Sequence, residues 1–384
     1  WEEVIVILHI VHDDKFIDMA YNIFEKASPN NNEFMIVTKQ KEFKYIKTTP
    51  ITRISPLKFL SKGFAKRLLQ YEFVVLHWLD DVKKHLVLNA PKNVKFIWIG
   101  WGGDYYCYVN KNLYLPITQN LVEKIEMHTI VNKTSLKFKI KNFIKQKLFL
   151  CEIKNTEKII NRINYFAPVL EEDYHLLASS FDEFRPKYID WNYGTLEDDL
   201  IRDNDLIISG KNILVGNSAT PENNHMDTFE ILKEINLSNR KIICPMSYGD
   251  INYAKAIEFE AKKIFGDKVQ VLNTFMHIDE YIKILSSCSI AIMNNLRQQA
   301  VGNIIIMMYM GSKVFLNKES PVYEFFKKNG AIIFTIEELN QREIDKPLNK
   351  EEILINRSIL KQYWSRDVIL NKTIKLIKEL SRRA

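Results

Sequence analysis

The stretch SIAIMNNLRQQAVGNIIIMMYMGSKVFL, residues 289–316, decides the fold class. Its first apolar run, 289–293, is short and rich in isoleucine, as expected for a buried parallel strand. A polar loop follows, and an apolar helix predicted over 303–310 ends at Gly311 before a second strand over 313–316. A strand, a helix and a strand in this order indicate a parallel sheet covered by helices, so the stretch predicts an α/β protein.

The same alternation continues in both directions along the chain. In the second half, further strands are predicted over 213–216, 241–245, 269–272 and 331–334, between helices over 226–234, 253–265, 278–286 and 321–329. In the first half, strands are predicted over 4–11, 33–37, 73–77, 94–99 and 162–166, with helices that include 17–26 and 61–70. Each half therefore predicts one doubly wound, Rossmann-like domain.

The domain boundary is predicted at a polar, acidic connector. The 384 residues suffice for two hydrophobic cores. The predicted parts are an amino-terminal domain, a hinge connector, a carboxyl-terminal domain and one or two final helices, over residues 1–188, 189–211, 212–345 and 346–384. Two such domains joined by a hinge are expected to face a central cleft.

Charge and composition narrow the class of partner. The chain carries 54 basic and 47 acidic residues, a net charge of +7, which favours anionic ligands or lipid headgroups without indicating nucleic acid. Its four cysteines are scattered, which fits a reducing compartment. Because no apolar run approaches the roughly 18 residues that span a bilayer and no secretion signal is visible, a cytoplasmic protein is expected.

One segment suggests contact with a membrane. Between residues 133 and 158, lysines such as Lys137, Lys139 and Lys145 alternate with apolar side chains. Such a helix could lie on an anionic bilayer surface. An ordinary solvated helix face is an equally good interpretation.

Ligands of doubly wound folds bind at the carboxyl ends of the strands, so the loops there are the candidate site. In the second domain, Gly216, Asn217 and Ser218 form a small turn after a strand that could approach a phosphate, although such a turn is more often only a turn. The loop 297–303 is a sharper candidate. Arg297 supplies a charge, and Gly302 with Asn303 opens a helix whose N-terminus suits a diphosphate.

A third loop could cover a nucleotide base. Phe275 precedes a predicted helix and offers a stacking face, although it could equally plug the edge of the sheet. The motifs GxGxxG, GxxxxGK[ST], HExxH and GxSxG are all absent from the sequence. Their absence disfavours dinucleotide oxidoreductases, P-loop enzymes, zincins and α/β-hydrolases.

Polar residues also follow three strands of the first domain. Asp14, His77 and Asp104 are the candidates for a general base or for binding sugar hydroxyls. Trp101 offers an apolar platform for an acceptor sugar, and the following two glycines, Gly102 and Gly103, permit close backbone approach. The structural alternative for Asp14 is that it caps the helix that follows.

Several of these strings together resemble a known family. The strings are Trp101-Gly102-Gly103-Asp104, Gly216-Asn217-Ser218, Pro245-Met246-Ser247-Tyr248, Arg297-Gln298-Gln299 with Gly302, and Asn317-Lys318-Glu319-Ser320-Pro321. Their order resembles the bacterial TDP-N-acetylfucosamine:lipid II N-acetylfucosaminyltransferases, glycosyltransferase family 56, from about residue 5 to about residue 339. The sequence departs from the family's pattern at Gly103, where Ala is common, and at 300–303, where the family has Gly-Ile-Gly-Thr.

The resemblance implies a GT-B hexosyltransferase without a catalytic metal. The second domain would bind a TDP-linked sugar through Gly216, Asn217, Ser218, Tyr248, Phe275, Arg297, Gln298, Gln299, Gly302, Asn303 and Glu319. The first domain would bind a polyprenyl-diphosphate-linked saccharide near Trp101. The donor would be a co-substrate, with no cofactor, and the protein would lie on the cytoplasmic face of the inner membrane and take part in surface glycan assembly.

Two questions stay open at this stage. For an inverting transfer, the expected order of candidate bases is Asp14, then Asp104, then His77, whereas a retaining enzyme would use them only to bind sugar hydroxyls. Glu319 could bind the ribose or be a surface acid. The alternatives to transfer are a non-catalytic protein that binds a nucleotide sugar or glycan, and another GT-B reaction such as nucleotide-sugar epimerisation.

Overall fold

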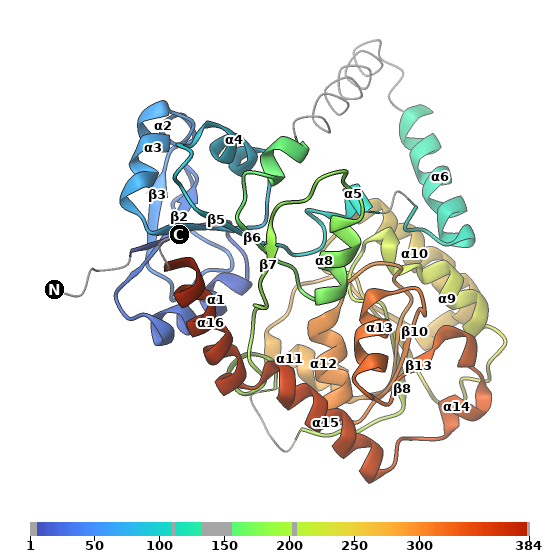
Figure 1. Cartoon of the computed structure of the whole chain (residues 1–384). Coiled ribbons are helices and arrows are strands. Elements are labelled where there is room, and N and C mark those ends of the chain that lie inside the picture. Colours follow the sequence, from blue (N-terminus) through green and yellow to red (C-terminus); the bar gives the residue numbers. More distant parts are fainter. Residues whose placement is uncertain (1–5, 110–111, 132–155, 202–205, 382–384) are drawn as a thin grey trace. The chain divides into compact units, whose positions relative to one another are not determined.

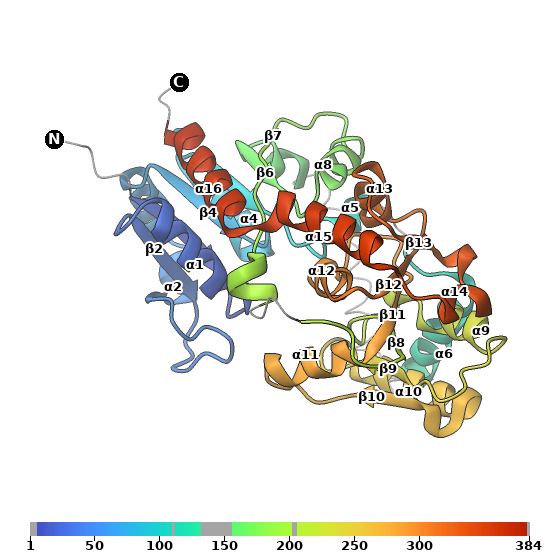
Figure 2. The same cartoon turned by 90° about the horizontal axis from the view of Figure 1, so that it is seen from below.

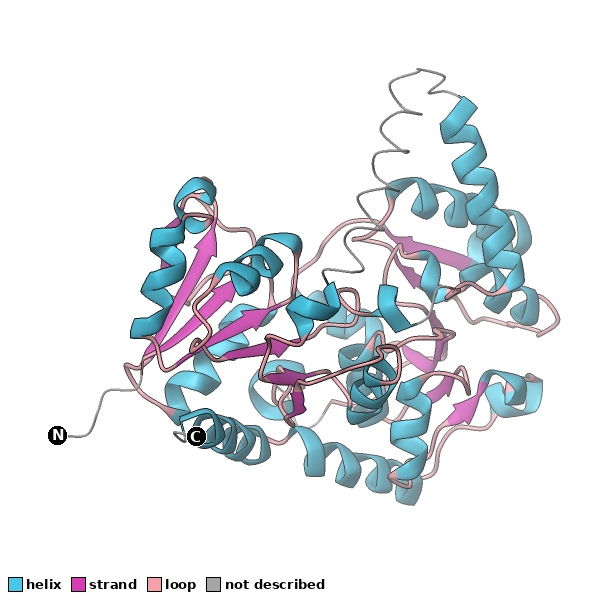
Figure 3. Cartoon of the chain, turned by 45° about the horizontal axis from the view of Figure 1, so that its top comes forward, coloured by secondary structure: helices cyan, strands magenta, loops and turns pink. Residues whose placement is uncertain are grey.

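Two parallel sheets organise the chain (Figure 1). The computed structural model describes residues 6–109, 112–131, 156–201 and 206–381. Each sheet belongs to a separate unit of the chain, with its own core. Figure 3 shows the strands of each sheet lying among helices, so the predicted α/β class with two doubly wound domains is confirmed.

Unit 1 holds a sheet of the order β3-β2-β1-β4-β5-β6-β7. Its strands are β1 (Ile7–Val11), β2 (Asn32–Val37), β3 (Ile51–Ile54), β4 (Phe73–His77), β5 (Phe96–Ile99), β6 (Tyr165–Ala167) and β7 (Lys187–Tyr188). Its helices are α1 (Phe16–Ala27), α2 (Pro56–Phe59), α3 (Lys62–Arg67), α4 (Asp81–Asn89), α5 (Tyr106–Val109), α8 (Glu171–Ala178) and α16 (Arg366–Ser381), with short turns η1 (Leu68–Gln70) and η2 (Leu196–Leu200). Central strands β1, β4 and β5 are buried along their whole length, and His9 and His77 are the polar residues in their otherwise apolar runs.

Unit 2 holds a sheet of the order β10-β9-β8-β11-β12-β13. Its strands are β8 (Asn212–Val215), β9 (Ile242–Pro245), β10 (Val269–Leu272), β11 (Cys288–Met293), β12 (Lys313–Leu316) and β13 (Phe334–Thr335). Its helices are α6 (Pro116–Val131), α9 (His225–Leu232), α10 (Ile251–Phe265), α11 (Ile278–Ser286), α12 (Val301–Met310), α13 (Pro321–Lys328) and α14 (Gln341–Asp345), with short turns η3 (Pro221–Asn223), η4 (Gly266–Lys268) and η5 (Ile336–Glu338). Helix α15 (Lys350–Trp364) runs from unit 2 into unit 1.

The first difference from the predicted domain division is α6, which lies inside the predicted domain 1–188 but belongs to unit 2. The carboxylate of Asp227 in α9 accepts the backbone N–H groups of Ile117 at 3.0 Å and Thr118 at 2.9 Å, and so caps the start of α6. Apolar side chains of α6, Leu121 and Ile125 among them, pack on the core of unit 2. These long-range contacts carry no local signal in the sequence.

The second difference is the end of the chain, predicted as helices appended to the second domain. Helix α16 instead packs against α1 of unit 1, and Figure 2 shows the two helices beside each other. The indole nitrogen of buried Trp191 donates to Oγ1 of Thr373 at 2.9 Å. Residues 189–199 of the predicted connector therefore also belong to unit 1.

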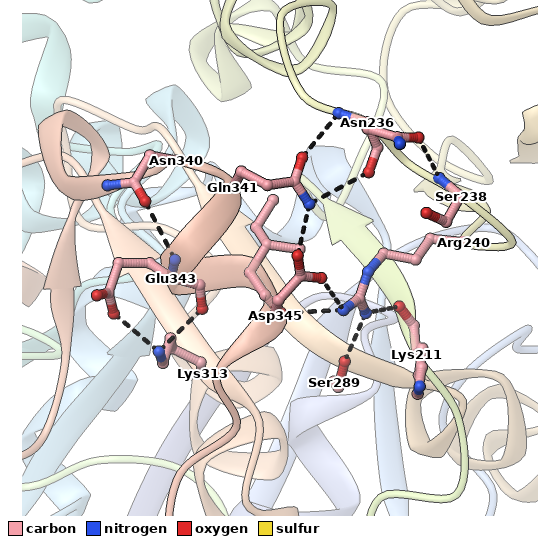
Figure 4. A network of polar contacts seen from close by, with 11 residues as sticks. Lys211, Asn236, Ser238, Arg240, Ser289, Lys313, Asn340, Gln341, Glu343 and Asp345 are labelled. Atoms are coloured by element: carbon pink, nitrogen blue, oxygen red, sulfur yellow. Dashed lines mark hydrogen bonds and ion pairs between the residues drawn. The ribbon is translucent and has the colours of Figure 1, made fainter.

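The amino ends of the strands in unit 2 are closed by a polar network around α14 (Figure 4). Arg240 is buried and donates to the carbonyl of Lys211 at 2.6 Å and to the carboxylate of Asp345 at 3.1 Å. Lys313 reaches the carboxylate of Glu343 at 2.9 Å. Because these charges are satisfied within the protein, the network is structural, and the opposite edge of the sheet is where ligands of this fold bind.

Candidate functional site

A glycine shapes the loop after β8. Gly216 has a φ of +66°, and a Cβ built there would lie 2.5 Å from Nε2 of His225. His225 is fully buried, and burial lowers its pKa to about 3, so the imidazole is neutral. The backbone N–H of Asn217 donates to Oδ1 of Asn223 at 3.1 Å. The buried side chains of His225 and Asn223 therefore fix the conformation of the turn predicted at 216–218.

Gln299 joins three loops at the carboxyl edge of the sheet. Its Nε2 donates to Oδ1 of Asn217 at 2.9 Å and to Oγ1 of Thr220 at 3.0 Å. Nδ2 of Asn217 donates in turn to the hydroxyl of Tyr248, after β9, at 2.8 Å. The structure thus brings together three of the predicted donor-site residues, with Ser218 buried beside them.

One atom of this network has no partner. Oε1 of Gln299 is buried, and no hydrogen-bond donor reaches it from the described residues. A buried amide oxygen left without a donor costs about 1–3 kcal/mol, so it is seldom retained without a reason. The arrangement offers this acceptor to a ligand with N–H or O–H groups.

Helix α12 begins with a strained residue. Ala300 precedes it with a φ of +62°, a conformation that residues with a Cβ seldom adopt. The site of a Cβ on Gly302, in the first turn, is open, with Leu200 its nearest neighbour at 3.8 Å. Nδ2 of Asn303 donates to the hydroxyl of Tyr281 at 2.9 Å, so this side chain is used structurally. The backbone N–H groups of this first turn are suited to an anion.

The remaining predicted donor residues differ in position. Arg297 is partly buried and donates through Nη1 to the carbonyl of Gln298 at 3.0 Å, and the Gln298 side chain is buried. Phe275 and Tyr248 follow neighbouring strands and are 60% and 48% exposed, so both present aromatic faces to solvent. Glu319 is exposed, outside the Gln299 network.

Sequence reasoning gave no role to a group of asparagines that support these loops. They are Asn223, Asn224, Asn294, Asn295 and Asn317. Nδ2 of Asn224 donates to the carbonyl of Asn294 at 2.9 Å, and Nδ2 of Asn317 donates to Oδ1 of Asn294 at 2.9 Å. The Asn-Asn pairs at 223–224 and 294–295 could have indicated these supporting residues. Asparagine is common throughout the chain, however, so the pairs do not stand out.

In unit 1, two of the three candidate bases lie in the interior. His77 has no exposed surface, and its ring lies 3.0 Å from Nδ1 of His9 and 2.5 Å from the hydroxyl of Tyr193. Burial and the neighbouring His9 hold the pKa of His77 well below its usual range, so it is neutral. This geometry gives His77 a packing and hydrogen-bonding role between strands β1 and β4.

Asp104 is enclosed in a similar way. Its carboxylate accepts the indole N–H of Trp98 at 2.7 Å and the backbone N–H groups of Leu79 and Trp101, each at 2.9 Å. Burial raises its pKa, while these three donors oppose the rise. Asp104 therefore ties the loop after β4 to the loop after β5, and positions Trp101.

Asp14 is the more accessible of the three. It is only partly buried, its Oδ1 accepts the backbone N–H of Phe16 at 3.1 Å, and burial raises its pKa. This bond to the first residue of α1 leaves Oδ2 for other contacts, but the N-cap position is occupied by Lys15, so Asp14 is not the cap foreseen as its structural alternative. The adjacent Asp13 is committed to the backbone of residues 44–46.

A charged cluster beside Asp14 was not predicted. His12 Nε2 lies 2.8 Å from Oδ2 of Asp80 and 2.6 Å from Nζ of Lys83, at the carboxyl ends of β1 and β4. Lys83 is buried, which lowers its pKa to about 8. Burial alone would raise the pKa of Asp80, but the His12 hydrogen bond and the Lys83 charge hold it well below its usual range. The string His12-Asp13-Asp14 was noticed in the sequence, but its partners 68 or more positions away were not.

Two tryptophans flank this region of unit 1. Trp78, directly after β4, has a φ of +63°, and its ring meets that of Trp101 edge to face at 5.6 Å. The indole nitrogen of Trp101 donates to the hydroxyl of Tyr193 at 2.8 Å. A bulky residue with a positive φ is a genuine outlier, which often marks a functional site.

Three further observations concern the basic stretch, metal binding and membrane-spanning helices. The basic stretch 133–158 lies outside the described residues except for its last three positions. Among the residues that the structure describes, no three His, Cys, Asp or Glu side chains are arranged to hold a metal ion. A search of the same residues finds no helix long and apolar enough to cross a membrane.

Comparison with known proteins adds a family and a fold. Residues 186–362 match the sequence model of the family described as 4-alpha-L-fucosyltransferase, glycosyl transferase group 56. This match confirms the family resemblance over that segment, which holds the Gln299 network.

Solved structures are similar over the whole chain. HepE of Anabaena, in complex with UDP and glucose, is 10% identical with a TM-score of 0.61, over 98% of this chain and 100% of that chain. Sucrose-phosphate synthase from Thermosynechococcus elongatus is 10% identical with a TM-score of 0.65, over 98% and 99%. A glycosyltransferase from Rickettsia africae is 13% identical with a TM-score of 0.60, over 100% of both chains. At these identities the likeness shows the fold, which is GT-B.

Proposed function

Because the chain is a GT-B glycosyltransferase whose residues 186–362 match glycosyl transferase group 56, we propose that it transfers a 4-acetamido-4,6-dideoxy hexose from a TDP-linked donor. The acceptor is a polyprenyl-diphosphate-linked saccharide used in bacterial surface glycan assembly, and the reaction takes place at the cytoplasmic face of the inner membrane. The nucleotide and the sugar come from the family resemblance. Complexes of HepE with UDP and with UDP-glucose support a nucleotide-sugar donor of this general kind.

The observation that carries the proposal is the Gln299 network. Three loops at the carboxyl edge of one parallel sheet are tied together by buried amides, and one buried amide oxygen is left without a donor. A donor sugar or nucleotide base supplies the O–H or N–H groups that such an oxygen accepts. The first turn of α12 and Arg297 then bind the diphosphate, whose negative charge grows as the glycosidic bond breaks.

Asp14 is the proposed base for an inverting transfer. It is a partly buried carboxylate with a raised pKa at the carboxyl end of β1, where an acceptor hydroxyl can approach. His77 and Asp104 are proposed as positioning residues because both are enclosed by their partners. A second candidate base is His12, whose Nε2 lies 2.8 Å from the Asp80 carboxylate.

Nucleotide binding tests the donor site. We expect micromolar binding of TDP in preference to UDP, GDP and CMP by calorimetric titration, and a loss of that binding in Gln299→Leu. The control is Gln341→Leu, which removes an amide from the opposite edge of the same sheet. Preference for another nucleotide would discard the TDP assignment, and no nucleotide binding at all would favour a non-catalytic protein.

Product analysis tests the reaction and the base. With a TDP-sugar, transfer requires the lipid-linked acceptor, whereas epimerisation would alter the sugar without one. Asp14→Asn is expected to lower turnover by about 100-fold or more with TDP binding unchanged. Wild-type turnover in Asp14→Asn together with a large loss in His12→Gln would move the base to His12.

A further inference from the structure

The short helices that follow edge strand β3 form a surface of exposed leucines and exposed lysines. This surface, here called the α2–η1 surface, comprises residues 55–70 of unit 1. Leu57 is 83% exposed, Leu69 is 56% exposed and Leu60 is 44% exposed. Singly exposed leucines are common, but three within 13 positions form a concentration that calls for an explanation.

The segment is held firmly from its inner side. Phe59 and Phe64 are buried, with ring centroids 5.0 Å apart, and Leu68 is fully buried. Ser55 and Ser61 cap the two helices by accepting backbone N–H groups of the following turn. The exposed leucines are therefore presented by an ordered scaffold.

The charge of the segment has one sign. Lys58, Lys62 and Lys66 are exposed, and none of the three pairs with a carboxylate among the described residues. Residues 39–67 hold nine Lys and Arg and one acid, Glu42, so this stretch alone exceeds the +7 of the whole chain. Neighbouring Arg67 donates to the hydroxyl of Tyr71, which in turn donates to the carboxylate of Glu33.

We propose that the α2–η1 surface docks on an anionic lipid bilayer. Lysines attract the headgroups while the leucines enter the boundary between headgroups and acyl chains, the combination that interfacial segments use. Nucleic acid would call for stacking aromatics, whereas the exposed apolar residues here are leucines. The inference concerns unit 1 alone and holds whatever sugar is transferred.

Vesicle co-sedimentation of the full chain tests it. Wild type is expected to bind vesicles of equal phosphatidylglycerol and phosphatidylcholine, and to bind pure phosphatidylcholine weakly. The triple variant Lys58→Gln, Lys62→Gln, Lys66→Gln should lose about fivefold in partitioning for each cation removed, an effect that salt diminishes. Leu57→Ser, Leu60→Ser, Leu69→Ser should lose at least about tenfold, even at low salt.

Matched controls separate this surface from a general effect. Lys255→Gln, Lys263→Gln, Lys268→Gln removes three exposed lysines of unit 2, and Ile207→Ser, Ile251→Ser, Leu354→Ser removes three apolar side chains that are each over 60% exposed. Neither control should change binding. Wild-type binding by both α2–η1 variants, with loss only on neutralising Lys137, Lys139, Lys141 and Lys145, would overturn the proposal in favour of the stretch 133–158. Nucleotide titration of the same variants reports on the donor site separately.

Discussion

The indole ring of Trp78 lies so close to Gly103 that a Cβ on Gly103 would be 2.6 Å from Cη2 of the ring. Gly103→Ala should therefore displace Trp78 from its left-handed position and destabilise the fold by about 1–3 kcal/mol. A changed tryptophan fluorescence spectrum and a lower urea midpoint would report it. Gly63→Ala, where the nearest atom is 3.8 Å away, is the matched control and should be neutral or stabilising. An unchanged spectrum and an unchanged urea midpoint in Gly103→Ala would mean that the Trp78 ring accommodates the added methyl group without a measurable loss of stability.

Ala300 is expected to be less favourable than glycine at its position. Its φ of +62° costs a residue with a Cβ about 1 kcal/mol, and the resembling family has glycine here. Ala300→Gly should raise the free energy of unfolding by about that amount. Ala256→Gly, inside helix α10, should lower it by about 1 kcal/mol. If both substitutions destabilise equally in chemical denaturation, the strain at Ala300 is absent.

Arg297 is expected to act on the transition state. Arg297→Ala should lower turnover by about 100-fold or more while the unfolding midpoint stays near that of wild type, the scale of losing one charge-stabilising donor. Arg342→Ala, an exposed arginine on α14, is the control and should leave turnover unchanged. Steady-state kinetics with the TDP-sugar make the comparison, and wild-type turnover would remove Arg297 from the mechanism.

Asp173 is expected to make stability depend on pH. Burial raises its pKa to about 7, against the hydrogen bonds that Tyr105 and Tyr106 donate to it at 2.8 and 2.5 Å. Because the folded state holds this proton more tightly than the unfolded state, its contribution is fully present below about pH 4 and is lost as pH rises through about 7. The change is on the order of 4 kcal/mol.

Asp173→Asn removes that titration. The free energy of unfolding of wild type minus that of the variant should therefore be larger at pH 5 than at pH 8, as measured by urea unfolding at both values. Asp182→Asn, an exposed carboxylate of the same unit, should show no such trend. A wild-type to Asp173→Asn difference that is constant with pH would show that Asp173 titrates alike in both states.

The sequence predicted the sheets better than the site. Strands β4, β10 and β12 have the bounds that their short, mainly apolar runs predict. Edge strands β3 and β7 were missed, since β3 mixes buried and exposed residues and β7 has only two. Donor-loop residues such as Gln299 could be predicted from their place after a strand. The enclosure of His77 by residues 9 and 193 could not, because only folding brings those positions together.

The return of α16 to unit 1 has a consequence for synthesis. Unit 1 needs residues from both ends of the described chain, whereas the sheet of unit 2 lies entirely between them. The strands of unit 2 are therefore synthesised after α1 and before α16, the helix that packs against α1. Until α16 emerges, α1 lacks the packing contacts that α16 makes with it. During that interval unit 1 is incompletely packed, and chaperones bind nascent chains at such stages.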